Sequence, residues 1–590
     1  MNPSRETLDK KLIELETVSG VREYEIQSKL KNLRSPDLEE DPCQEWIYEV
    51  LAFSFSENYT DQKTGWGTYF GPMSIVPTDD GKIVESPSIQ RVDEKVIAYW
   101  SERYKLTNNP LLQARYAGLV WDLSEKATGK KPDYSAAVIY CEALLKIAEC
   151  KIHKYEVDII EKLERALFIA TSINNQNLIE KSKEEILDYE SLVAEDSKPG
   201  LWGFSFDLLV NNKKVNLSEA KEKEIIDTLE ARLQRLKDSD PWDCEEAAER
   251  LGRYYRRKGL KEECSRIIKT LGDSFETAAN NVEPLAAFSL LEHIHKVYIK
   301  FDLIDDAERI RKTMRSLEPK VRDNMTPIYH EMEIDREQLK AYIEQILDGN
   351  LEQSLARIVI DYIPSHEQIK NQLYKVAKQY PIPFLITKNI TDDQGRKISE
   401  VGSLENDLDG NIVFQMCQNM TVSMIFLSTV LEQAIKKFSL DSEGIINYLF
   451  HSPVFASEQR NILLKGIQAY LEEDYIIAVH LLIPQIEAAI RNLVQMSNGV
   501  VLKSARGGGF HLKALDELLR SEQVKQSLGE DIALYLRVIL TDQRGWNVRN
   551  NVCHGIFQQH LFSKSLTERL IHILLILAQL RLNNHSSSTS

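Results

Sequence analysis

Positive charge is scarce in this sequence. Its 73 lysine and arginine residues are outnumbered by 90 aspartate and glutamate residues, which gives a net charge of −17 at pH 7. Because contacts to phosphate require a surplus of basic side chains, this balance excludes a general nucleic-acid-binding protein. The segment 501–590 is the exception, since eleven basic residues there outnumber seven acidic ones. We therefore expect any RNA contact in this segment.

Long apolar runs and a disulfide-like cysteine framework are also lacking. The longest apolar stretch, Leu570 to Leu580, is interrupted by His572 and Gln579 and is shorter than the ~20 residues that a membrane helix requires. The 7 cysteines are odd in number and scattered, and the chain starts with a charged helical pattern that has no apolar signal segment. We expect no membrane anchor and a location in the reducing cytoplasm.

Helical patterns dominate the sequence, and we predict an all-α protein. With 590 residues and 43% hydrophobic content, the chain is large enough for several domains or one long repeat array. Residues 1–92 are expected to form an N-terminal region, with two helices and an aromatic cluster at 1–60 and an irregular segment or a short hairpin at 61–92. Residues 586–590 are expected to be a disordered tail.

Residues 93–345 contain a repeated turn between helices. The segment Tyr255–Ile267 aligns with Tyr298–Ile310 at an offset of 43 residues, and Leu178 matches the same turn 82 residues before Leu260. In each copy a polar residue and a leucine follow a helix, and acidic residues then open the next one. This resembles the tetratricopeptide type of helical hairpin, so we expect an α-solenoid, with an irregular helical bundle as the alternative.

Residues 346–459 are expected to form a helical linker region with a small β insertion near 381–416. Prolines and turn formers beside β-prone runs predict one or two hairpins there. The acidic pair Asp407 and Asp409, followed by Gly410, lacks the glutamate of a calcium loop, so we interpret it as a turn. Helices are expected to resume at about 417.

The segment Gly545–Gly555 carries residue types suited to chemistry. It reads Gly-Trp-Asn-Val-Arg-Asn-Asn-Val-Cys-His-Gly. Arg549 supplies a permanent cation, Asn550 an amide, and His554 a group that titrates near neutral pH. On a regular helix Asn550 and His554 share a face, whereas Arg549 and His554 diverge by roughly 140°. Either the flanking glycines end the helix here, or a second copy across a two-fold axis supplies the missing partner.

This motif lies between helices predicted at about 530–543 and 565–582. Arg-Asn-x-x-x-His-Gly in that setting resembles the signature of the HEPN superfamily of small helical domains, and Leu481–Arg491 is similar to an earlier HEPN helix. The resemblance covers about 460–585. It implies a C-terminal HEPN helical bundle and a metal-independent ribonuclease site, usually built at a homodimer interface.

The resemblance also implies roles for individual residues. His554 would take the proton of the RNA 2′-hydroxyl, Arg549 would stabilise the charged phosphorus centre, and Asn550 would orient His554 or the phosphate. The expected product is a 2′,3′-cyclic phosphate, and DNA would be inert because it lacks the attacking hydroxyl. Neither a metal nor another cofactor is required.

Four further residues are candidates for binding substrate or supporting the site: Glu487, Arg491, Arg544 and Asn547. Two readings stay open for Glu487, a salt bridge to Arg549 and a plain solvated helix face. The Arg-Asn-His pattern is also compatible with simple capping and pairing in a helical bundle.

Two functions from different classes follow. The first is an endoribonuclease acting as a toxin or antiphage-defence effector, with a protein or phage-derived trigger bound by the solenoid. The second is a noncatalytic HEPN scaffold for nucleotide binding or dimerisation, with the solenoid as a protein-interaction surface.

Other chemical patterns are weaker. Zinc ligation by His293 and His295 together with Cys244 and Cys264 is conceivable, but cysteine is a common core residue in helical repeats. Cys553 beside His554 is interpreted as a packing residue rather than a nucleophile, because neighbours on a helix point about 100° apart. The glycine-rich segment 506–509 lacks the Gly-Lys-Ser/Thr ending of a phosphate loop, so we interpret it as a flexible loop.

Overall fold

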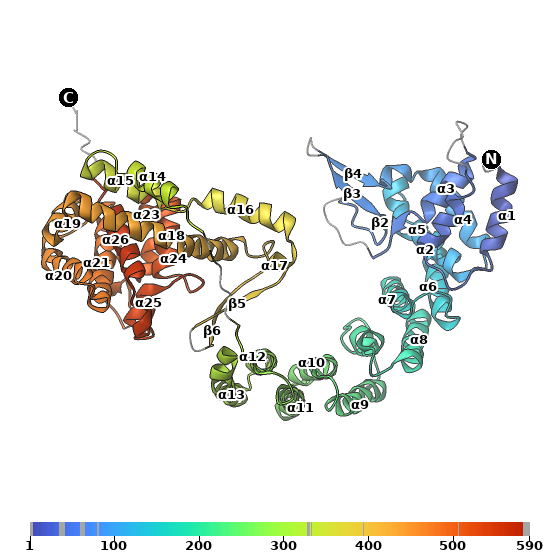
Figure 1. Ribbon diagram of the computed structural model, residues 1–590. Coiled ribbons are helices and arrows are strands. Elements are labelled where there is room, and N and C mark those ends of the chain that lie inside the picture. The colour runs from blue at the N-terminus through green and yellow to red at the C-terminus, as the bar shows by residue number, and fades with distance from the viewer. Residues whose placement is uncertain are drawn as a thin grey trace. The chain divides into compact units, whose positions relative to one another are not determined.

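Helices dominate the computed structural model, and its strands pair in small antiparallel sheets of two strands each (Figure 1). The structure describes residues 4–34, 42–58, 65–78, 82–326, 331, 333–392, 395–505 and 507–581. The prediction of a mainly helical protein is confirmed, whereas the predicted tail at 586–590 lies outside the described residues. The chain divides into two compact units, Met1–Met314 and Arg315–Ser590.

The first unit consists of helices joined by short turns, with two small hairpins near its start. Its elements are α1 (Arg5–Leu15), α2 (Glu23–Lys31), α3 (Gln44–Ala52), β1 (Phe55–Ser56), β2 (Gly71–Pro72), β3 (Ser74–Pro77), β4 (Ile83–Ser86), η2 (Ile89–Arg91), α4 (Glu94–Leu106), α5 (Pro110–Thr128), α6 (Tyr134–Glu149), α7 (Glu156–Ser172), α8 (Gln176–Val193), η3 (Pro199–Leu201), η4 (Phe206–Val210), α9 (Glu219–Leu236), α10 (Pro241–Lys258), α11 (Lys261–Ala279), α12 (Pro284–Lys300) and α13 (Ile304–Asp323).

The start of this unit differs from the prediction of two helices, because the residues described before β1 form three. Trp46 of α3 donates its indole N–H to the carbonyl of Leu30 at the end of α2, at 2.8 Å. Trp100 of α4 donates to the carbonyl of Tyr48 at 3.1 Å. These tryptophan side chains therefore hold neighbouring helices together through hydrogen bonds as well as through apolar contact.

The repeated turn has one backbone geometry in three places. Asn174, Gly259 and Asp302 all have positive φ values, of 51°, 75° and 62°. Leu260 and Leu303, which follow the last two, each donate a backbone N–H to the tyrosine carbonyl five residues earlier, at 2.9 Å. This is the left-handed helix ending that glycine, asparagine and aspartate favour. The 43-residue offset is correct for these two turns, but Leu178 lies inside α8, so the earlier copy of the turn is three residues upstream of the predicted position.

The second unit holds the remaining elements. They are α14 (Arg336–Ile346), α15 (Leu351–Asp361), α16 (His366–Gln379), α17 (Ile382–Leu385), β5 (Lys388–Thr391), β6 (Lys397–Val401), α18 (Leu408–Phe438), α19 (Ser442–Leu449), η5 (Ser457–Gln459), α20 (Arg460–Leu471), α21 (Tyr475–Met496), β7 (Leu502–Ser504), β8 (Phe510–Leu512), α22 (Leu515–Leu519), α23 (Glu522–Leu528), α24 (Glu530–Leu540), α25 (Val548–Cys553), η6 (Gln559–Leu561) and α26 (Lys564–Leu577).

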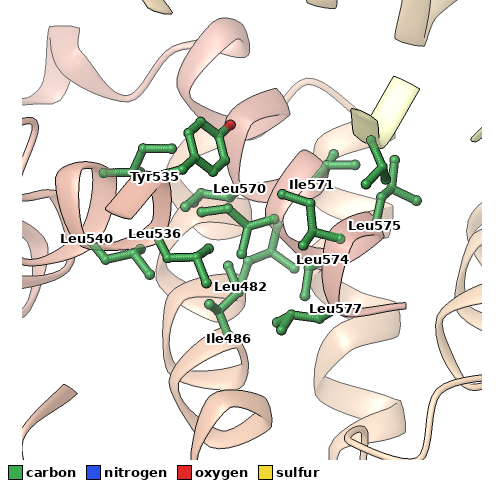
Figure 2. Close-up of a cluster of buried hydrophobic side chains, with 14 of the residues drawn as sticks. Leu482, Ile486, Tyr535, Leu536, Leu540, Leu570, Ile571, Leu574, Leu575 and Leu577 are labelled. Carbon is green, nitrogen blue, oxygen red and sulfur yellow. The ribbon is translucent and has the colours of Figure 1, made fainter. Parts of the chain in front are cut away.

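Helix α26 forms the centre of this unit. All its residues from Leu566 to Leu577 are buried, and it contacts α15, α18, α19 and α21. Figure 2 shows Leu570 and Leu574 of α26 among leucines of α21 and α24. A helix that is surrounded by protein carries apolar residues on every face. The apolar stretch from Leu570 to Leu580, which is too short for a membrane helix, therefore lies at the core of the second unit.

One hydrophobic core extends from Ile346 to Ala578. The predicted regions 346–459 and 460–585 both contribute to it, and the boundary between the compact units falls within α13 rather than at 345. We therefore treat the second unit as a single folded body, in which the C-terminal motif depends on helices far upstream in the sequence.

The predicted β insertion is present as a hairpin of β5 and β6. Helix α18, however, begins at Leu408 and not near 417. Asp407 accepts a hydrogen bond from the backbone N–H of Gly410 at 2.9 Å and so caps the helix, which is why an apparent turn sequence stands at a helix start. The β-prone run 384–387 begins inside the single helical turn α17 rather than in a strand.

Among the described residues, α21 is the one helix long and apolar enough to cross a membrane, with a mean hydropathy of 1.3 over its most apolar window. It packs against α20 and α26 and carries the paired charges of Glu487 and Arg491. Core helices meet the same criteria of length and composition, so this observation is weak support for a membrane span.

Candidate functional site

The loop between α24 and α25 folds back on the helix that precedes it. Trp546 donates its backbone N–H to the carbonyl of Val538 at 2.9 Å, and Gly545 donates to the carbonyl of Asp542 at 2.9 Å. A Cβ atom at Gly545 would collide with the Val538 carbonyl oxygen. Glycine is therefore required by close backbone approach, and the tight loop fixes where α25 begins.

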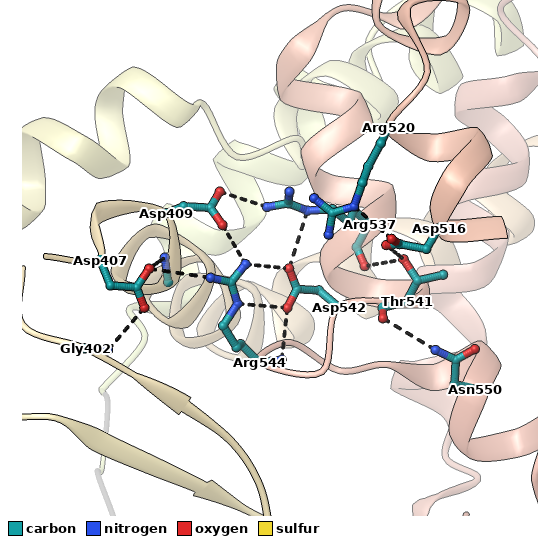
Figure 3. Close-up of polar contacts among 11 residues, drawn as sticks. Gly402, Asp407, Asp409, Asp516, Arg520, Arg537, Thr541, Asp542, Arg544 and Asn550 are labelled. Carbon is teal, nitrogen blue, oxygen red and sulfur yellow. Dashed lines mark hydrogen bonds and ion pairs between the residues drawn. The ribbon is translucent and has the colours of Figure 1, made fainter. Parts of the chain in front are cut away.

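Arg544 anchors this loop to the start of α18 (Figure 3). Its guanidinium lies 2.9 Å from the carboxylate of Asp542 and 2.5 Å from that of Asp409, and Arg537 of α24 lies 3.0 Å from Asp409. Burial acts to raise the pKa of Asp542, but the hydrogen bonds and charge of Arg544, with Arg537, hold that pKa below its ordinary value. Arg544, a predicted substrate contact, is thus engaged in positioning the motif.

Asn547 and Asn550 form the first turn of α25. Asn547 adopts a left-handed conformation, with φ 50° and ψ 33°, directly before the helix. Asn550 donates its amide to the side-chain oxygen of Asn547 at 2.7 Å and to the carbonyl of Thr541 at 3.4 Å, the second of which is drawn in Figure 3. The amide of Asn550 therefore ties α25 to the preceding loop. This differs from the expected role of orienting His554.

Arg549 is held between α25 and α21. Its Nε donates to Glu487 Oε2 at 2.9 Å, and its Nη1 donates to Asn550 Oδ1 at 3.2 Å. Glu487 also accepts a hydrogen bond from Arg491 at 2.6 Å. Of the two readings left open for Glu487, the salt bridge is the one observed. The side chain of Arg549 keeps 25% of its surface exposed, so the guanidinium is fixed in direction and still reachable by a ligand.

His554 occupies the end of α25 and is exposed. Its backbone N–H donates to the carbonyl of Asn550 at 3.0 Å, and Gly555 follows with a left-handed φ of 67°. Within the described part of the chain, no hydrogen bond or ion pair engages the imidazole ring. Helix α25 therefore ends just before Gly555, which is one of the two alternatives left open by the sequence, and the His554 side chain is exposed.

The helix is regular from Val548 to Cys553, so the predicted divergence of Arg549 and His554 stands. Arg549 is turned toward α21 through its bond to Glu487, while His554 is one and a half turns further along α25. One copy of the motif does not bring the cation and the imidazole to the same face.

An apolar hollow beside the motif was not anticipated from the sequence. It has a volume of about 280 Å³ and is lined by Thr421, Met424, Trp546, Val548, Phe557, Leu561 and Leu566. Phe557 and Phe562 lie edge to face with ring centroids 5.0 Å apart, and Phe562 stacks on His480 of α21 at 5.1 Å. The aromatic residues after Gly555 are the only feature of the sequence that points to this hollow, and their spacing does not match a known motif.

The weaker candidates have structural partners. His293 pairs with Glu245 at 2.8 Å and contacts the rings of Trp242 and Phe275. Across the described ranges no group of three or more His, Cys, Asp or Glu side chains is arranged to hold a metal ion. Gly507 to Gly509 lie in the loop that connects β7 and β8. The segment interpreted as a flexible loop is therefore the turn of a β-hairpin, and this hairpin was not predicted from the sequence. Arg506 lies outside the described residues.

Comparisons of the chain with models of known protein families, with curated proteins and with solved structures found no match. The assignment of function therefore depends on the residues and geometry described above.

Proposed function

We propose that the second unit is a metal-independent endoribonuclease of the HEPN type, whose site combines Arg549 of one copy with His554 of another. The observation that carries this proposal is the contrast between the two side chains. Arg549 is oriented by Glu487 and Asn550, whereas His554 is exposed at a helix end with no partner among the described residues. A fixed cation and a free imidazole are the groups required for phosphoryl transfer without a metal.

The proposed chemistry uses only these groups and the RNA. His554 takes the proton from the 2′-hydroxyl, whose oxygen forms a bond to the adjacent phosphorus. Arg549 binds the phosphate oxygens as negative charge develops on them. The bond from phosphorus to the 5′-oxygen of the next nucleotide breaks, and that oxygen takes up a proton from water or from protonated His554. The products are a 2′,3′-cyclic phosphate and a free 5′-hydroxyl.

The N-terminal unit is proposed to restrain or trigger this activity. Its helical hairpins, repeated with the same turn geometry at Asn174, Gly259 and Asp302, support an α-solenoid. Arrays of this kind commonly bind a peptide or protein, so a phage-derived or host protein is the proposed trigger. A cytoplasmic toxin or antiphage effector is the biological role that we propose on this basis.

Mixing of two inactive variants tests the composite site. Arg549→Ala and His554→Ala should each cleave RNA at least about 100-fold more slowly than the unaltered protein, in buffer containing EDTA. A mixed dimer of the two variants contains one site with both residues intact and one site with neither. Equal amounts, refolded or expressed together, should recover about a quarter of the full activity, since half of the dimers are mixed.

The same experiment has a result that contradicts the proposal. If Arg549 and His554 act within one copy, every site in the mixture lacks one of them and the activity stays at the level of the single variants. Absence of cleavage of total RNA by the unaltered protein, with and without its N-terminal unit, would contradict the ribonuclease proposal itself. Loss of cleavage in EDTA would contradict its metal independence.

A noncatalytic scaffold is the second candidate, and one observation favours it. Glu487 pairs with both Arg549 and Arg491, as in a structural ion-pair network. In this reading the second unit dimerises or binds a nucleotide while the first unit binds a partner protein. A dimer that binds RNA and leaves it intact under all conditions would favour the scaffold.

A further inference from the structure

A second concave site lies in the same unit and shares no residue with the ribonuclease motif. It has a volume of about 460 Å³, within the range of small-molecule sites. It is open to solvent on one side, and its walls come from α14, the end of α15 with the segment that follows, α16 and α18. The lining residues are Tyr342, Asp361, Tyr362, Ile363, Pro364, Ser365, Gln368, Ile369, Gln372, Asn419, Ser423 and Phe426. None of them is basic.

Three aromatic rings form the apolar part of this cavity. Tyr342 packs edge to face against Phe426, with ring centroids 6.2 Å apart, and its hydroxyl lies 2.9 Å from that of Tyr362. The Tyr342 hydroxyl also donates to the carboxylate of Asp361. Burial raises the pKa of Tyr362 to about 12, so its hydroxyl stays protonated at neutral pH. The rings are therefore held in place before any ligand arrives.

Amide side chains from two facing helices supply the polar part. Asn419 of α18 donates to Gln372 of α16 at 3.2 Å and accepts from Gln415 at 3.0 Å. Gln368 and Gln372 lie one turn apart on α16 and are both exposed, and the side-chain amide of Gln368 has no hydrogen-bond partner among the described residues. An unengaged amide offers both a donor and an acceptor to a ligand.

A buried network behind the cavity connects two of its walls. Arg569 of α26 is fully buried and donates to Ser423 at 2.5 Å and to the Tyr535 hydroxyl at 3.3 Å. Tyr535 in turn donates to His572 Nδ1 at 2.8 Å, and the His572 ring packs edge to face with Tyr362. This network fixes Ser423 and Tyr362 in position, which reduces the entropic cost of binding.

The charges around the cavity determine what kind of ligand it suits. Asp361 places a negative charge in its lining, while Arg569, which has no carboxylate partner in the described ranges, places a positive charge behind Ser423. A bound cation would be attracted by Asp361 and repelled by Arg569, and a bound anion would be repelled by Asp361 and attracted by Arg569. A neutral, dipolar molecule is repelled by neither charge. If it has a flat ring, the edge of that ring can form hydrogen bonds with amides.

We propose that this cavity binds a nucleoside or its free base, packed against the rings of Tyr342, Tyr362 and Phe426. The edge of the base bonds to Gln368 and its neighbouring amides, which are suited to a ring edge that alternates hydrogen-bond donors and acceptors. This site is independent of the proposed RNA cleavage. It gives the second unit a small-molecule ligand in addition to its proposed substrate.

Calorimetry with the full-length protein tests the proposal. The probes are guanosine, adenosine, cytidine and uridine, with ribose, choline and inorganic phosphate for comparison. At least one nucleoside should bind with one site per chain, and the three comparison compounds should not bind. Gln368→Leu should weaken binding at least about tenfold, because one ring-edge bond is lost and a bound polar group is left unpaired. Gln372→Leu should also weaken it.

Matched variants make the result specific. Asn371 lies on α16 between the two glutamines and is exposed, bonding only to Glu367 at 3.4 Å, so Asn371→Leu should leave binding unchanged. Arg549→Ala should also leave it unchanged, which separates this cavity from the motif. No binding of any nucleoside at millimolar concentration, or tighter binding of choline or phosphate, would overturn the proposal. So would equal binding by Gln368→Leu, Gln372→Leu and the unaltered protein with unchanged melting temperatures.

Discussion

Arg549 donates to Glu487 at 2.9 Å across the interface between α25 and α21, and Arg491 donates to the other oxygen of the same carboxylate at 2.6 Å. Two guanidinium groups around one carboxylate leave a net positive charge at this point, in a protein whose net charge is −17. Glu487 therefore orients Arg549, and the group of Glu487, Arg491 and Arg549 still attracts a phosphate because its net charge is positive.

Replacement of Arg549 by lysine should abolish most RNA cleavage without unfolding the protein. A guanidinium bonds to Glu487 through Nε and still presents other N–H groups to a phosphate, whereas an ammonium is a single mobile charge. We expect at least a tenfold decrease in the cleavage rate of Arg549→Lys, with a melting temperature within a few degrees of the unaltered protein.

Arg520 provides the matched control for this substitution. It forms an exposed pair with Asp516 at 2.8 Å in the same unit, so Arg520→Lys should retain full cleavage. Full turnover by Arg549→Lys would show that a bidentate cation is unnecessary and would favour the scaffold function.

Replacement of Arg544 by alanine should destabilise the second unit. The side chain of Asp542 is only 4% exposed, and without Arg544 its charge is left with the more distant Nε of Arg537, 3.4 Å away. Removing one partner of a buried ion pair costs about 3 kcal/mol. Arg520→Ala, which removes an exposed pair, should change the stability by less than about 1 kcal/mol. Equal effects of the two substitutions on urea unfolding would show that the ion pairs of Arg544 with Asp542 and Asp409 add little stability.

The shared core predicts which fragment of the protein folds alone. A chain of residues 315–590 retains the whole core, whereas one that starts at 440 lacks α18. Without α18, the buried Arg569 loses its bonds to the carbonyl of Met420 and to Ser423. We expect the 315–590 fragment to be soluble with a cooperative thermal transition, and the 440–590 fragment to aggregate. A well-folded 440–590 fragment would show that the C-terminal motif belongs to a smaller, separate domain.

Local features of this fold were accessible from the sequence because they depend on neighbouring residues. The helical pattern, the hairpin of β5 and β6 and the 43-residue turn repeat follow from spacing and turn chemistry. Asp407 was misread because the same side chain that favours a turn also caps a helix, and the choice depends on what the following residues pack against.

The environment of the motif depends on contacts between distant residues and was less accessible. The i, i+4 pair of Glu487 and Arg491 indicates only that the two share a helix face. Nothing local indicates that Arg549, 62 positions after Glu487, completes that pair, or that Arg544 bonds to Asp409, 135 positions before it. The cavity of Tyr342 and Phe426 likewise requires helices from separate stretches of the chain to meet.

His572 should make the second unit sensitive to acid. Burial, together with the charge of Arg569, lowers the pKa of His572 from 6.5 to about 3. Between these values the unfolded chain binds a proton that the folded chain does not, so stability is highest above pH 6.5 and is lost as the pH falls toward 3. The shift corresponds to a loss of stability on the order of 5 kcal/mol. Glu568, on the preceding turn, has the opposite effect on the pH dependence of stability. Burial raises the pKa of its carboxyl group, so protonation at lower pH favours the folded state.

Comparison of variants isolates the contribution of this histidine. In urea unfolding of the 315–590 fragment, or of the second transition of the whole chain, His572→Gln should be less stable at pH 7.5. It should lose less stability than the unaltered protein between pH 6.5 and 4. His560 is exposed, and His560→Gln should retain the unaltered pH dependence. The same steep pH dependence in His572→Gln would place the acid sensitivity on other groups, with the carboxylates of Asp409 and Asp542, whose pKa values are lowered, as the next to be replaced.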